Sequence, residues 1–385
     1  MQSHRSSASL VTFVALSFSI FSSTAFAEVI NSSHGPLKLE THRTDLHHPW
    51  GMTFLNQNEV LVTERRGRLW RLNLQQGTKR EITGLPVIQA KGQGGLLDVE
   101  LSPDFQQDRR VYLSFTGGSK DRKSTHVGFG ILRGNRLANF KTVFKARPFI
   151  PTGYHFGSRL VFDNKGHLFI SLGDRGKMAL AQDTSNHAGA MIRIFAGGGI
   201  PKTNPFIGKS AYQPEIYSYG HRNIQGAALN PWTNELWTHE HGPRGGDELN
   251  IIRSGRNYGW PKVTYGINYD GSEISAFTSM TGLTPPIHHW TPSIAPSGMT
   301  FVYGPEFPRW EGNLLIGSLK FRQLRNLKVK GARVLNEEIL LDQLDERIRD
   351  VEIGPGGVIY LLTDSKAGRL MSLRLKSSAQ PKPQP

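Results

Sequence analysis

The sequence has no cysteine. Without thiols the chain has neither disulfide bonds nor thiolate metal ligands, so its stability must come from packing, helped where a metal contributes by a hard cation that prefers oxygen ligands. The sequence also lacks the GxSxG, GxxxxGK(S/T) and HExxH motifs, and it has no GxGxxG between a strand and a helix. The usual signatures of hydrolases and nucleotide-binding proteins are therefore absent.

Long apolar runs are almost as scarce. The one clear example, LVTFVALSFSIF (10–21), has 12 residues, and as a helix it would rise about 18 Å, too little for a bilayer core of about 30 Å. Arg5 precedes this run and Ala25-Phe26-Ala27 follows it, a pattern typical of a secretory signal peptide over residues 1–27. We therefore expect cleavage before Glu28, export to the periplasm or medium, and no membrane span.

Acidic residues are in the minority, because 31 Asp and Glu oppose 46 Lys and Arg and give a formal charge of +15. The basic residues are dispersed along the chain, and export argues against a nucleic-acid partner. A solvated surface or an anionic small ligand is the better interpretation of this charge. The hydrophobic content of 37% predicts a folded protein, and only the proline-rich segment 376–385 is expected to be a disordered tail.

A repeated pattern indicates the architecture. Each copy has an apolar alternation, a turn rich in Pro, Asn, Asp or Gly, and a short β-rich run. The six copies are MTFLNQNEVLVTERRGRLWRL (52–72), VELSPDFQQDRRVYLSFTG (99–117), LVFDNKGHLFISLGD (160–174), AALNPWTNELWTHEHG (227–242), MTFVYGPEFPRWEGNLLIGSLK (299–320) and VEIGPGGVIYLLTDSKAGRLMSLRL (351–375).

The spacing of these copies favours a propeller. Their starts lie 47 to 72 residues apart, which is enough for a four-stranded sheet with its loops. Sheets of this size arranged radially form a β-propeller and leave only short edges. We therefore predict an all-β, six-bladed β-propeller of four-stranded antiparallel sheets over residues 28–375. A pair of β-sandwiches is the alternative that the same short strands allow. In a propeller, functional residues are scattered along the chain and meet where loops converge.

His239 and His241 alternate to one face of a predicted strand and suggest a zinc site. Their spacing indicates no third ligand, and paired strand histidines are more often surface or hydrogen-bonded residues. Zinc is therefore the minor interpretation. The neighbouring segment EHGPRGGDE (240–248) is unusual in so basic a chain, because it combines three acidic residues with three glycines.

Six segments together carry a resemblance to a known family. They are GQGGLLDVELSPDF (92–105), HFGSRLVFDNKGHLFISLGDRG (155–176), YGHRNIQGAALNP (219–231), EHGPRGGDELN (240–250), GRNYGWP (255–261) and RIRDVEIGPGG (347–357). In this order they resemble the soluble pyrroloquinoline-quinone-dependent sugar dehydrogenases, and most of all the bacterial periplasmic aldose sugar dehydrogenases. The resemblance covers nearly the whole chain after residue 27, and it implies a six-bladed propeller with quinone and calcium at the channel mouth.

The resemblance implies two calcium sites. The carbonyls of Gly242 and Pro243 would bind the calcium that also contacts the quinone, while Glu248 and the carbonyl of Tyr258 are similar to a second, structural site. Calcium takes six to eight oxygen ligands, both carbonyls and carboxylates, so these groups suit it. Read without the resemblance, GPRGG would be an ordinary tight turn.

The resemblance also implies a cage for the three carboxylates of the quinone. Arginine suits such a ligand because its planar fork donates two hydrogen bonds to one carboxylate. The matching residues are Gln93, Arg222, Asn223, Lys320, Arg347 and Arg349. The alternation in RIR places Arg347 and Arg349 on one face of a strand.

The implied reaction is oxidation of an aldose at its anomeric carbon to the lactone, with a hydride passing to the quinone. His155 matches the general base, and Arg222 together with calcium would stabilise the developing negative oxygen. The sequence departs from the glucose-specific relatives at Tyr154, where they have Asp before the histidine. Asp174 is the candidate to orient the imidazole instead.

Several neighbouring positions and functions stay open. Leu180 matches a pocket-lining position and Trp290 falls where relatives contact sugar, whereas Asp98 and Trp260 are expected to be structural. A calcium-dependent propeller lactonase or related hydrolase would share the metal without needing the basic cage. A noncatalytic propeller that binds a carbohydrate or a protein is the other alternative. The expected partners are a small aldose and an electron acceptor that the sequence does not identify.

Overall fold

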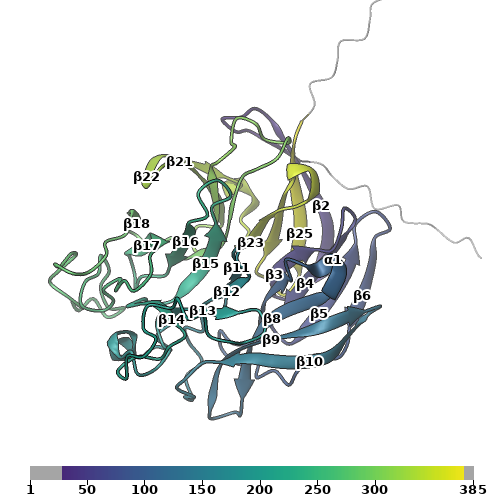
Figure 1. Ribbon diagram of the computed structural model, residues 1–385. Helices are drawn as coiled ribbons and strands as arrows, with labels where there is room; N and C mark the ends of the chain where they lie inside the picture. Colours follow the sequence, from purple (N-terminus) through teal and green to yellow (C-terminus); the bar gives the residue numbers. More distant parts are fainter. Residues whose placement is uncertain (1–27, 377–385) are drawn as a thin grey trace, which may run out of the picture.

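The computed structural model describes residues 28–376 (Figure 1). The predicted signal peptide (1–27) lies outside the described residues, as does the predicted tail apart from Lys376, whose backbone N–H donates to the carbonyl of Pro36. Among the helices of the described part, none is both long and apolar enough to cross a membrane.

The strands form six antiparallel sheets that follow one another in chain order around a centre (Figure 1). The first three contain β3 (Pro49–Phe54), β4 (Glu59–Glu64), β5 (Arg68–Asn73) and β6 (Thr78–Ile82); β7 (Leu96–Leu101), β8 (Arg110–Gly118), β9 (Lys123–Arg133) and β10 (Arg136–Lys145); and β11 (Leu160–Phe162), β12 (His167–Ser171), β13 (Ala190–Phe195) and β14 (Ile216–Tyr219).

The next three sheets complete the ring. They contain β15 (Ile224–Leu229), β16 (Leu236–Glu240), β17 (Asp247–Ile252) and β18 (His288–Trp290); β19 (Pro296–Phe301), β20 (Leu314–Ser318), β21 (Gln323–Lys330) and β22 (Arg333–Leu340); and β23 (Ile348–Ile353), β24 (Ile359–Thr363) and β25 (Gly368–Leu375) with β2 (Leu37–Leu46) and β1 (Glu28–Ile30). The helical segments are short: α1 (Phe105–Asp108), η1 (Met178–Gln182), η2 (Asp342–Leu344) and η3 (Pro355–Gly357).

This architecture confirms the predicted six-bladed propeller. Each predicted repeat begins within the innermost strand of a sheet or, for 160–174, at its first residue. These strands, β3, β7, β11, β15, β19 and β23, contact one another in order around the centre. Five sheets have four strands, and the sixth has a fifth because β1 is added at its outer edge.

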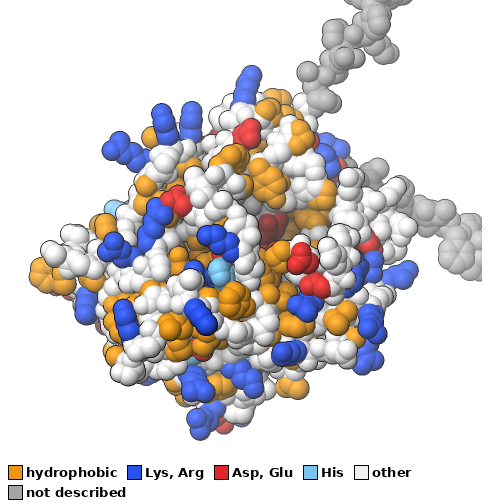
Figure 2. Space-filling view, in the orientation of Figure 1, with side chains coloured by type: hydrophobic (Ala, Val, Ile, Leu, Met, Phe, Trp, Pro, Cys, Tyr) orange, Lys and Arg blue, Asp and Glu red, His pale blue; other side chains and the backbone are white. Residues whose placement is uncertain are grey.

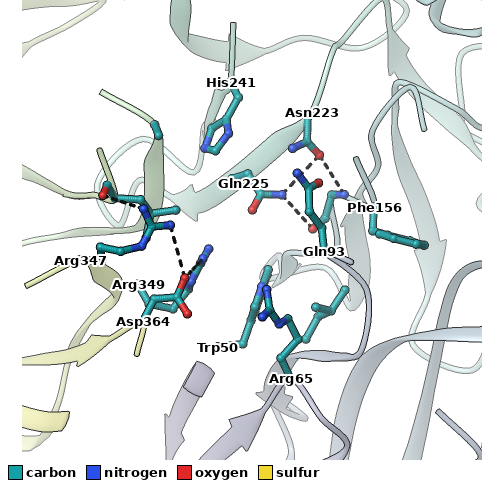
Figure 3. A pocket seen from close by; sticks show the side chains of 14 residues that line it. Trp50, Arg65, Gln93, Phe156, Asn223, Gln225, His241, Arg347, Arg349 and Asp364 are labelled. Carbon is teal, nitrogen blue, oxygen red and sulfur yellow. Dashed lines mark hydrogen bonds and ion pairs between the residues drawn. The ribbon is translucent and has the colours of Figure 1, made fainter. Parts of the chain in front are cut away.

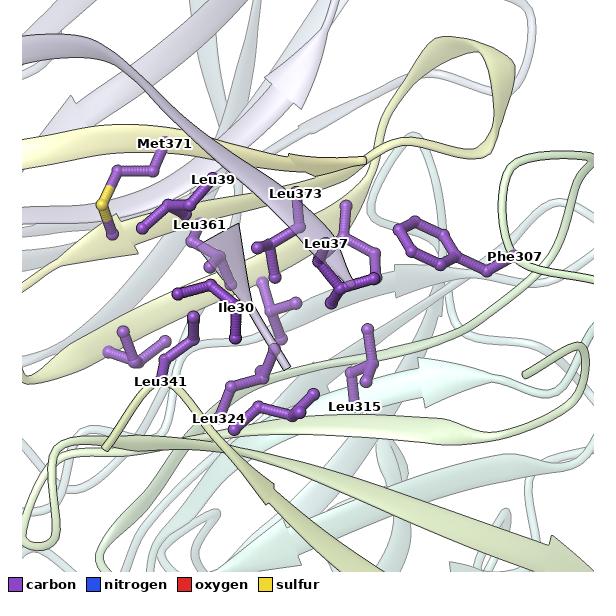
Figure 4. Packing of buried hydrophobic residues seen from close by; sticks show 14 of the residues in the cluster. Ile30, Leu37, Leu39, Phe307, Leu315, Leu324, Leu341, Leu361, Met371 and Leu373 are labelled. Carbon is purple, nitrogen blue, oxygen red and sulfur yellow. The ribbon is translucent and has the colours of Figure 1, made fainter. Parts of the chain in front are cut away.

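The ring is closed by strands from the two ends of the described chain. β2 pairs with β25 from Leu37 opposite Leu375 to Leu46 opposite Gly368, and Figure 1 shows the two strands side by side. Leu37, Leu39 and Leu373 lie in one buried cluster at this joint (Figure 4). Each fully buried leucine stabilises the fold by about 1.5–3 kcal/mol, so the joint is held by packing as well as by strand pairing.

The core of the molecule lies between neighbouring sheets. Leu61 of β4 and Leu69 of β5, for example, share a buried cluster with Val99 of β7 and Leu113 of β8. The hydrophobic face of each sheet is thus covered by the next sheet, which leaves the central channel free for polar side chains.

One arginine ties three innermost strands together in that channel. The guanidinium of Arg159 lies 3.0 Å from a carboxylate oxygen of Asp98 on β7 and 2.7 Å from one of Asp350 on β23. It also stacks 4.2 Å from the ring centre of Trp50. Asp98 was expected to be structural, and this ion pair gives it such a role.

Candidate functional site

A cavity of about 210 Å³ opens at the end of the channel where the innermost strands begin. Its lining comes from different sheets and includes Trp50, Gln93, Asn223, Gln225, Arg347 and Arg349 (Figure 3). Figure 2 shows this hollow near the centre of one face, with Lys and Arg side chains distributed around it. The lining therefore contains four of the residues predicted to bind the quinone.

His155 lies beside this cavity in a hydrogen-bonded arrangement. Its Nδ1 is 2.6 Å from Oδ1 of Asp174, while its backbone N–H donates to Oε1 of Gln93 at 2.8 Å. Asp174 is only 1% exposed and accepts a second hydrogen bond, of 2.8 Å, from the indole N–H of Trp260. Within residues 28–376 no hydrogen bond engages Nε2 of His155. The imidazole is therefore held by Asp174 with one ring nitrogen free.

The backbone around His155 explains how it reaches the rim. The backbone of His155 has a φ of 51°, a left-handed conformation that is uncommon for residues other than glycine. A Cβ on Gly157 would lie 2.5 Å from the carbonyl oxygen of Ser171, so the chain after His155 passes close to β12 only because glycine stands there. Asp174 lies three residues after the end of β12, and its carboxylate reaches the histidine from there.

Arg222 and Asn223 stand at the entrance to β15. The guanidinium of Arg222 donates to the carbonyl of His241 at 2.9 Å and lies 5.5 Å from the Trp260 ring centre. Asn223 lines the cavity, and its Oδ1 accepts from the backbone N–H of Gly157 at 3.2 Å. Arg222 is thus at the rim, on the side of the cavity that carries His155.

Arg347 and Arg349 converge on Asp364 across the cavity. The distances from their guanidinium nitrogens to Oδ2 of Asp364 are 3.5 and 2.6 Å, so the two side chains lie on one face, as their alternation predicted. Burial alone would raise the pKa of Asp364, but Arg349, His48 and Arg347 together hold it below its ordinary value. Nε of Arg349 is buried and has no hydrogen-bond partner among residues 28–376.

Lys320 is less closely engaged. Its backbone N–H donates to Ile294 at 3.1 Å, and its ammonium lies 5.3 Å from the ring centre of Phe321. The side chain is exposed, and the cavity is lined by its neighbour Leu319. The structure therefore places Lys320 outside the lining.

The Gly242-Pro243 turn is fixed by Asp247. This fully buried carboxylate accepts from the backbone N–H groups of Gly242, Ile294 and Ala295 at 2.7 to 2.9 Å. A Cβ on Gly242 would lie 2.2 Å from the carbonyl oxygen of Gly245, so only glycine fits. The carbonyl of Pro243 accepts from the N–H of Gly245 at 2.7 Å and retains one lone pair.

A second group of oxygen atoms lies behind that turn. Glu248 on β17 is paired opposite Glu240 on β16, and Asn250 donates to both carboxylates at 3.3 and 3.4 Å. Burial, reinforced by the charge of Glu240, raises the pKa of Glu248 well above its ordinary value. Oδ1 of Asn250 is buried and accepts no hydrogen bond from the described part of the chain.

Tyr258 belongs to the same cluster through its neighbours. Its ring stacks on His221 with ring centres 4.5 Å apart, and Nδ1 of His221 lies 2.9 Å from Glu240. Glu240 also accepts a short hydrogen bond from the backbone N–H of Arg222. The cluster thus connects the predicted structural calcium site to the predicted catalytic arginine.

The two histidines considered for zinc occupy different surroundings. His239 is buried, and neither of its ring nitrogens is hydrogen-bonded within the described residues, whereas Nε2 of His241 lies 2.6 Å from the carbonyl oxygen of Pro296. Burial lowers the pKa of His241 to about 3. Among residues 28–376, no group of three His, Cys, Asp or Glu side chains is arranged to hold a metal ion.

Three further positions can be placed. Tyr154 is 59% exposed, and its ring centre lies 6.4 Å from that of His155. Leu180 is in η1 and Trp290 bonds Glu337 through its indole N–H; neither lines the central cavity.

Sequence reasoning missed several residues of the site. Trp50, Arg65, Gln225 and Asp364 line the cavity, and Glu240 joins the carboxylate cluster. Only Glu240 carried a signal, because it begins the acidic segment 240–248. Trp50 and Gln225 lie in the innermost strands β3 and β15, and Arg65 and Asp364 follow the ends of β4 and β24. These positions converge only through the ring geometry.

Comparisons with known proteins agree with this fold. The family described as glucose/sorbosone dehydrogenase matches residues 46–372. The chain is 43% identical over 376 residues to aldose sugar dehydrogenase YliI of Escherichia coli, covering 96% of this chain and 99% of that protein.

Two solved structures are also similar. The apo form of the soluble aldose sugar dehydrogenase from Escherichia coli has a TM-score of 0.86 and 43% identity, covering 88% of this chain and 100% of that one. The quinone-bound aldose sugar dehydrogenase from Streptomyces coelicolor has a TM-score of 0.74 and 28% identity, covering 88% and 98%.

Proposed function

The chain belongs to the glucose/sorbosone dehydrogenase family, and from this premise we propose that it is an aldose sugar dehydrogenase that uses pyrroloquinoline quinone and calcium. The proposed reaction oxidises the aldose at its anomeric carbon to the lactone. The observation that carries the proposal is the His155–Asp174 pair, with a distance of 2.6 Å, at the rim of a cavity lined by Arg347 and Arg349.

The cavity suits an anionic, planar cofactor. Arg347 and Arg349 have only Asp364 as a carboxylate partner among residues 28–376, and Nε of Arg349 has no hydrogen-bond partner. Two guanidinium groups can each donate a pair of hydrogen bonds to a carboxylate. Gln93 and Asn223 add amide groups on the opposite side of the cavity (Figure 3), and Lys320 would act from the rim. These residues would hold the quinone.

The oxygen-rich segments suit calcium. The carbonyls of Gly242 and Pro243 would serve the ion at the quinone, because Asp247 fixes the turn that carries them. Glu248 and the carbonyl of Tyr258 would serve a structural ion. The unpartnered Oδ1 of Asn250 supports this second site, since a buried amide oxygen without a donor is a ready ligand for a hard cation.

His155 would act as the general base. When bound, the quinone would accept the hydride from the sugar, and calcium would polarise the reacting carbonyl. His155 would take the hydroxyl proton on Nε2, because Nδ1 faces Asp174. The carboxylate then holds the ring in one orientation and stabilises the imidazolium that forms.

Arg222 and Trp260 would support this step from the same side. The guanidinium of Arg222 is fixed by the carbonyl of His241 and would stabilise negative charge that develops on oxygen. Trp260 donates to Asp174 and so maintains the orientation of the carboxylate. Tyr154 replaces the acidic residue of the glucose-specific relatives, so Asp174 is the carboxylate available to His155 in this chain.

His155→Ala tests the assignment. In protein loaded with quinone and calcium, we expect single-turnover quinone reduction by glucose to slow about 10²–10⁴-fold, the usual contribution of a general base, while quinone titration stays close to that of the parent. Arg222→Ala should weaken quinone binding and turnover together. His42→Ala on β2 is the matched control, because that histidine bonds Ser372 in the sixth sheet, outside the cavity. Normal reduction by His155→Ala would remove it from the mechanism.

The two alternative functions, a propeller lactonase and a noncatalytic binding protein, predict different experimental results. A lactonase would hydrolyse a lactone with calcium alone, and a binding protein would show no quinone reduction. An absorbance spectrum after addition of quinone and calcium, followed by sugar, distinguishes the dehydrogenase from the other two, and lactone hydrolysis with calcium alone distinguishes the lactonase from the binding protein. We also propose that the protein works outside the cytoplasm, on the basis of the pattern in residues 1–27, and that it passes electrons to an acceptor still to be identified.

A further inference from the structure

A second cavity, of about 220 Å³, adjoins the central one. Three loops enclose it: the chain before β3, the turn between β4 and β5, and the loop between β6 and β7. Arg65 lines both cavities, and Figure 3 shows its side chain beside Trp50. We call this second cavity the basic groove; its side chains include His47, His48, Arg65, Arg66 and Lys91.

Two of these cations have no partner. Within residues 28–376, neither the guanidinium of Arg65 nor the ammonium of Lys91 forms a hydrogen bond to the protein or an ion pair. Arg66 differs, because it lies 2.9 Å from Glu64, as does His48, which lies 2.8 Å from Asp364. Nδ1 of His47 is buried without a partner. The groove thus has two uncompensated positive charges.

The backbone holds these charges together. The N–H of Arg65 donates to the carbonyl of His48 at 3.1 Å, and the N–H of Gly94 donates to the carbonyl of Lys91 at 3.0 Å. A Cβ on Gly95 would lie 1.8 Å from the carbonyl oxygen of Arg65. Only glycine at position 95 allows the loop of Lys91 to approach Arg65, so the local sequence builds this arrangement.

The same loop faces the catalytic histidine on its other side. The N–H of Gln93 donates to the carbonyl of Gly153 at 2.9 Å, and Oε1 of Gln93 accepts from the N–H of His155. A Cβ on Gly92 would lie 2.6 Å from the carbonyl oxygen of Gly153. A single turn of chain therefore separates the basic groove from the rim where His155 lies.

We propose that the basic groove binds the carboxylate or phosphate group of a small molecule whose other end reaches the quinone cavity. The proposal rests on the proposed function, because the quinone cavity is what the molecule reaches. Two kinds of molecule share this chemistry: an aldose with an acidic group, such as a uronic acid or a sugar phosphate, and an anionic electron acceptor. Arg65 and Lys91 would bind the anion, and His47 would donate from the wall.

The first test needs no activity. Apo protein is titrated with inorganic phosphate at constant ionic strength, set with sodium chloride because salt screens surface charge, and binding is followed by the shift in melting temperature. We expect Lys91→Gln and Arg65→Gln to weaken phosphate binding about fivefold each, the size of one partly exposed ion pair. Lys330→Gln, an exposed lysine at the end of β21, removes the same charge elsewhere and should not change it.

The second test separates the two sources with loaded enzyme. For a sugar, the ratio of KM for glucuronate or glucose 6-phosphate to KM for glucose should rise about fivefold in Lys91→Gln. For an acceptor, the ratio of KM for ferricyanide to KM for the cationic phenazine methosulfate should rise instead. A rise in either ratio supports the groove and identifies its ligand.

The outcomes also separate this proposal from the proposed function. Equal phosphate shifts in the parent, Lys91→Gln and Lys330→Gln, with both KM ratios unchanged, would overturn the groove while sugar oxidation stands. If the loaded parent oxidises no aldose, the proposed function fails, and the phosphate titration of apo protein still decides whether the groove binds an anion. Because Arg65 also lines the quinone cavity, quinone titration checks whether Arg65→Gln changes cofactor binding. Lys91 does not line that cavity, so the result for Lys91→Gln decides whether the proposal stands.

Discussion

Two pairs of buried carboxylates in this propeller differ in whether a cationic side chain of the protein compensates their charge. Asp98 and Asp350 meet in the central channel, and Arg159 lies between them at 3.0 and 2.7 Å. Glu240 and Glu248 meet between β16 and β17, and within residues 28–376 no Lys or Arg side chain forms an ion pair with either. The first pair has its counter-charge inside the chain, whereas the second has only neutral donors and His221 around it.

The difference indicates which part of the fold depends on a ligand. Burying a carboxylate without a counter-charge is costly, and the cost is reduced either by a paired cation or by protonation. Arg159 supplies this cation in the channel from within the chain. The pair Glu240 and Glu248 instead requires a proton or a metal cation, so the region behind the Gly242-Pro243 turn should respond to calcium.

The largest effect is expected from removing the internal cation. Arg159→Met leaves Asp98 and Asp350 buried together without a counter-charge, and breaking such a pair usually costs about 3–5 kcal/mol. Urea denaturation of apo protein measures the loss. Arg193→Met is the matched control, since Arg193 is buried and donates to Asn204 but forms no ion pair with a carboxylate in the part of the chain that the structure describes. Equal losses in the two variants would contradict the proposed role of Arg159.

A smaller effect is expected at the second pair. Calcium at 100 times its dissociation constant should stabilise the parent by about 2.7 kcal/mol, measured by thermal melts with EGTA or calcium and without quinone. Glu248→Gln should lose most of this gain. In EGTA the variant should be at least as stable as the parent, because one of two repelling carboxylates is gone. An undiminished calcium shift in Glu248→Gln would exclude Glu248 as a ligand.

The smallest effect is expected at Glu100, which lies in the innermost strand β7. Burial, together with the charge of Asp98, raises the pKa of Glu100 from 4.5 to about 8. A carboxyl with a raised pKa contributes stability that is complete below pH 4.5 and is lost as the pH rises through about 8. The parent should therefore lose stability relative to Glu100→Gln over this range.

We expect a difference of roughly 1–2 kcal/mol, reduced from the full shift because Glu100 is partly exposed to screening solvent. Thermal melts of both proteins between pH 4 and pH 9 give the profile. Glu273→Gln, at an exposed loop position, should show a difference that does not depend on pH. A flat profile for Glu100→Gln as well would mean that folding does not raise the pKa of this carboxyl.

The sequence was sufficient to predict the innermost strand of each sheet. The repeats predicted β3, β7, β11, β15, β19 and β23 because their turns and apolar alternation recur. The outer strands carry no such signal, since β10 and β22 are half exposed and mix polar with apolar residues. The joint of β2 with β25 was not predicted, because β2 precedes the first repeat and its partner is recognised only in space.

Some residues of the site could be predicted from the sequence and others could not. Asp174 was named as the candidate to orient the imidazole of His155 because Tyr154 stands where the glucose-specific relatives have Asp, and in the structure the two side chains are 2.6 Å apart. Trp260 was interpreted as structural, although it donates to Asp174 from the far end of another loop. Asp364 and Arg65 were missed because no local pattern distinguishes a loop residue that lines a cavity from one in solvent. The roles of the predicted ligands stay predictions.

The joint between β2 and β25 also sets the order in which the molecule can assemble. Leu37 and Leu375 are opposite each other in the sheet, so, although β2 can pair locally with β1, its pairing with β25 must wait until almost the whole chain exists. Contacts this distant in sequence slow folding, because a long loop has to close before they form. Five sheets can form locally by hairpins, whereas the sixth is completed last. A chain shortened before β25 would therefore keep an open ring with an unpaired edge at β2, and such edges are prone to aggregation.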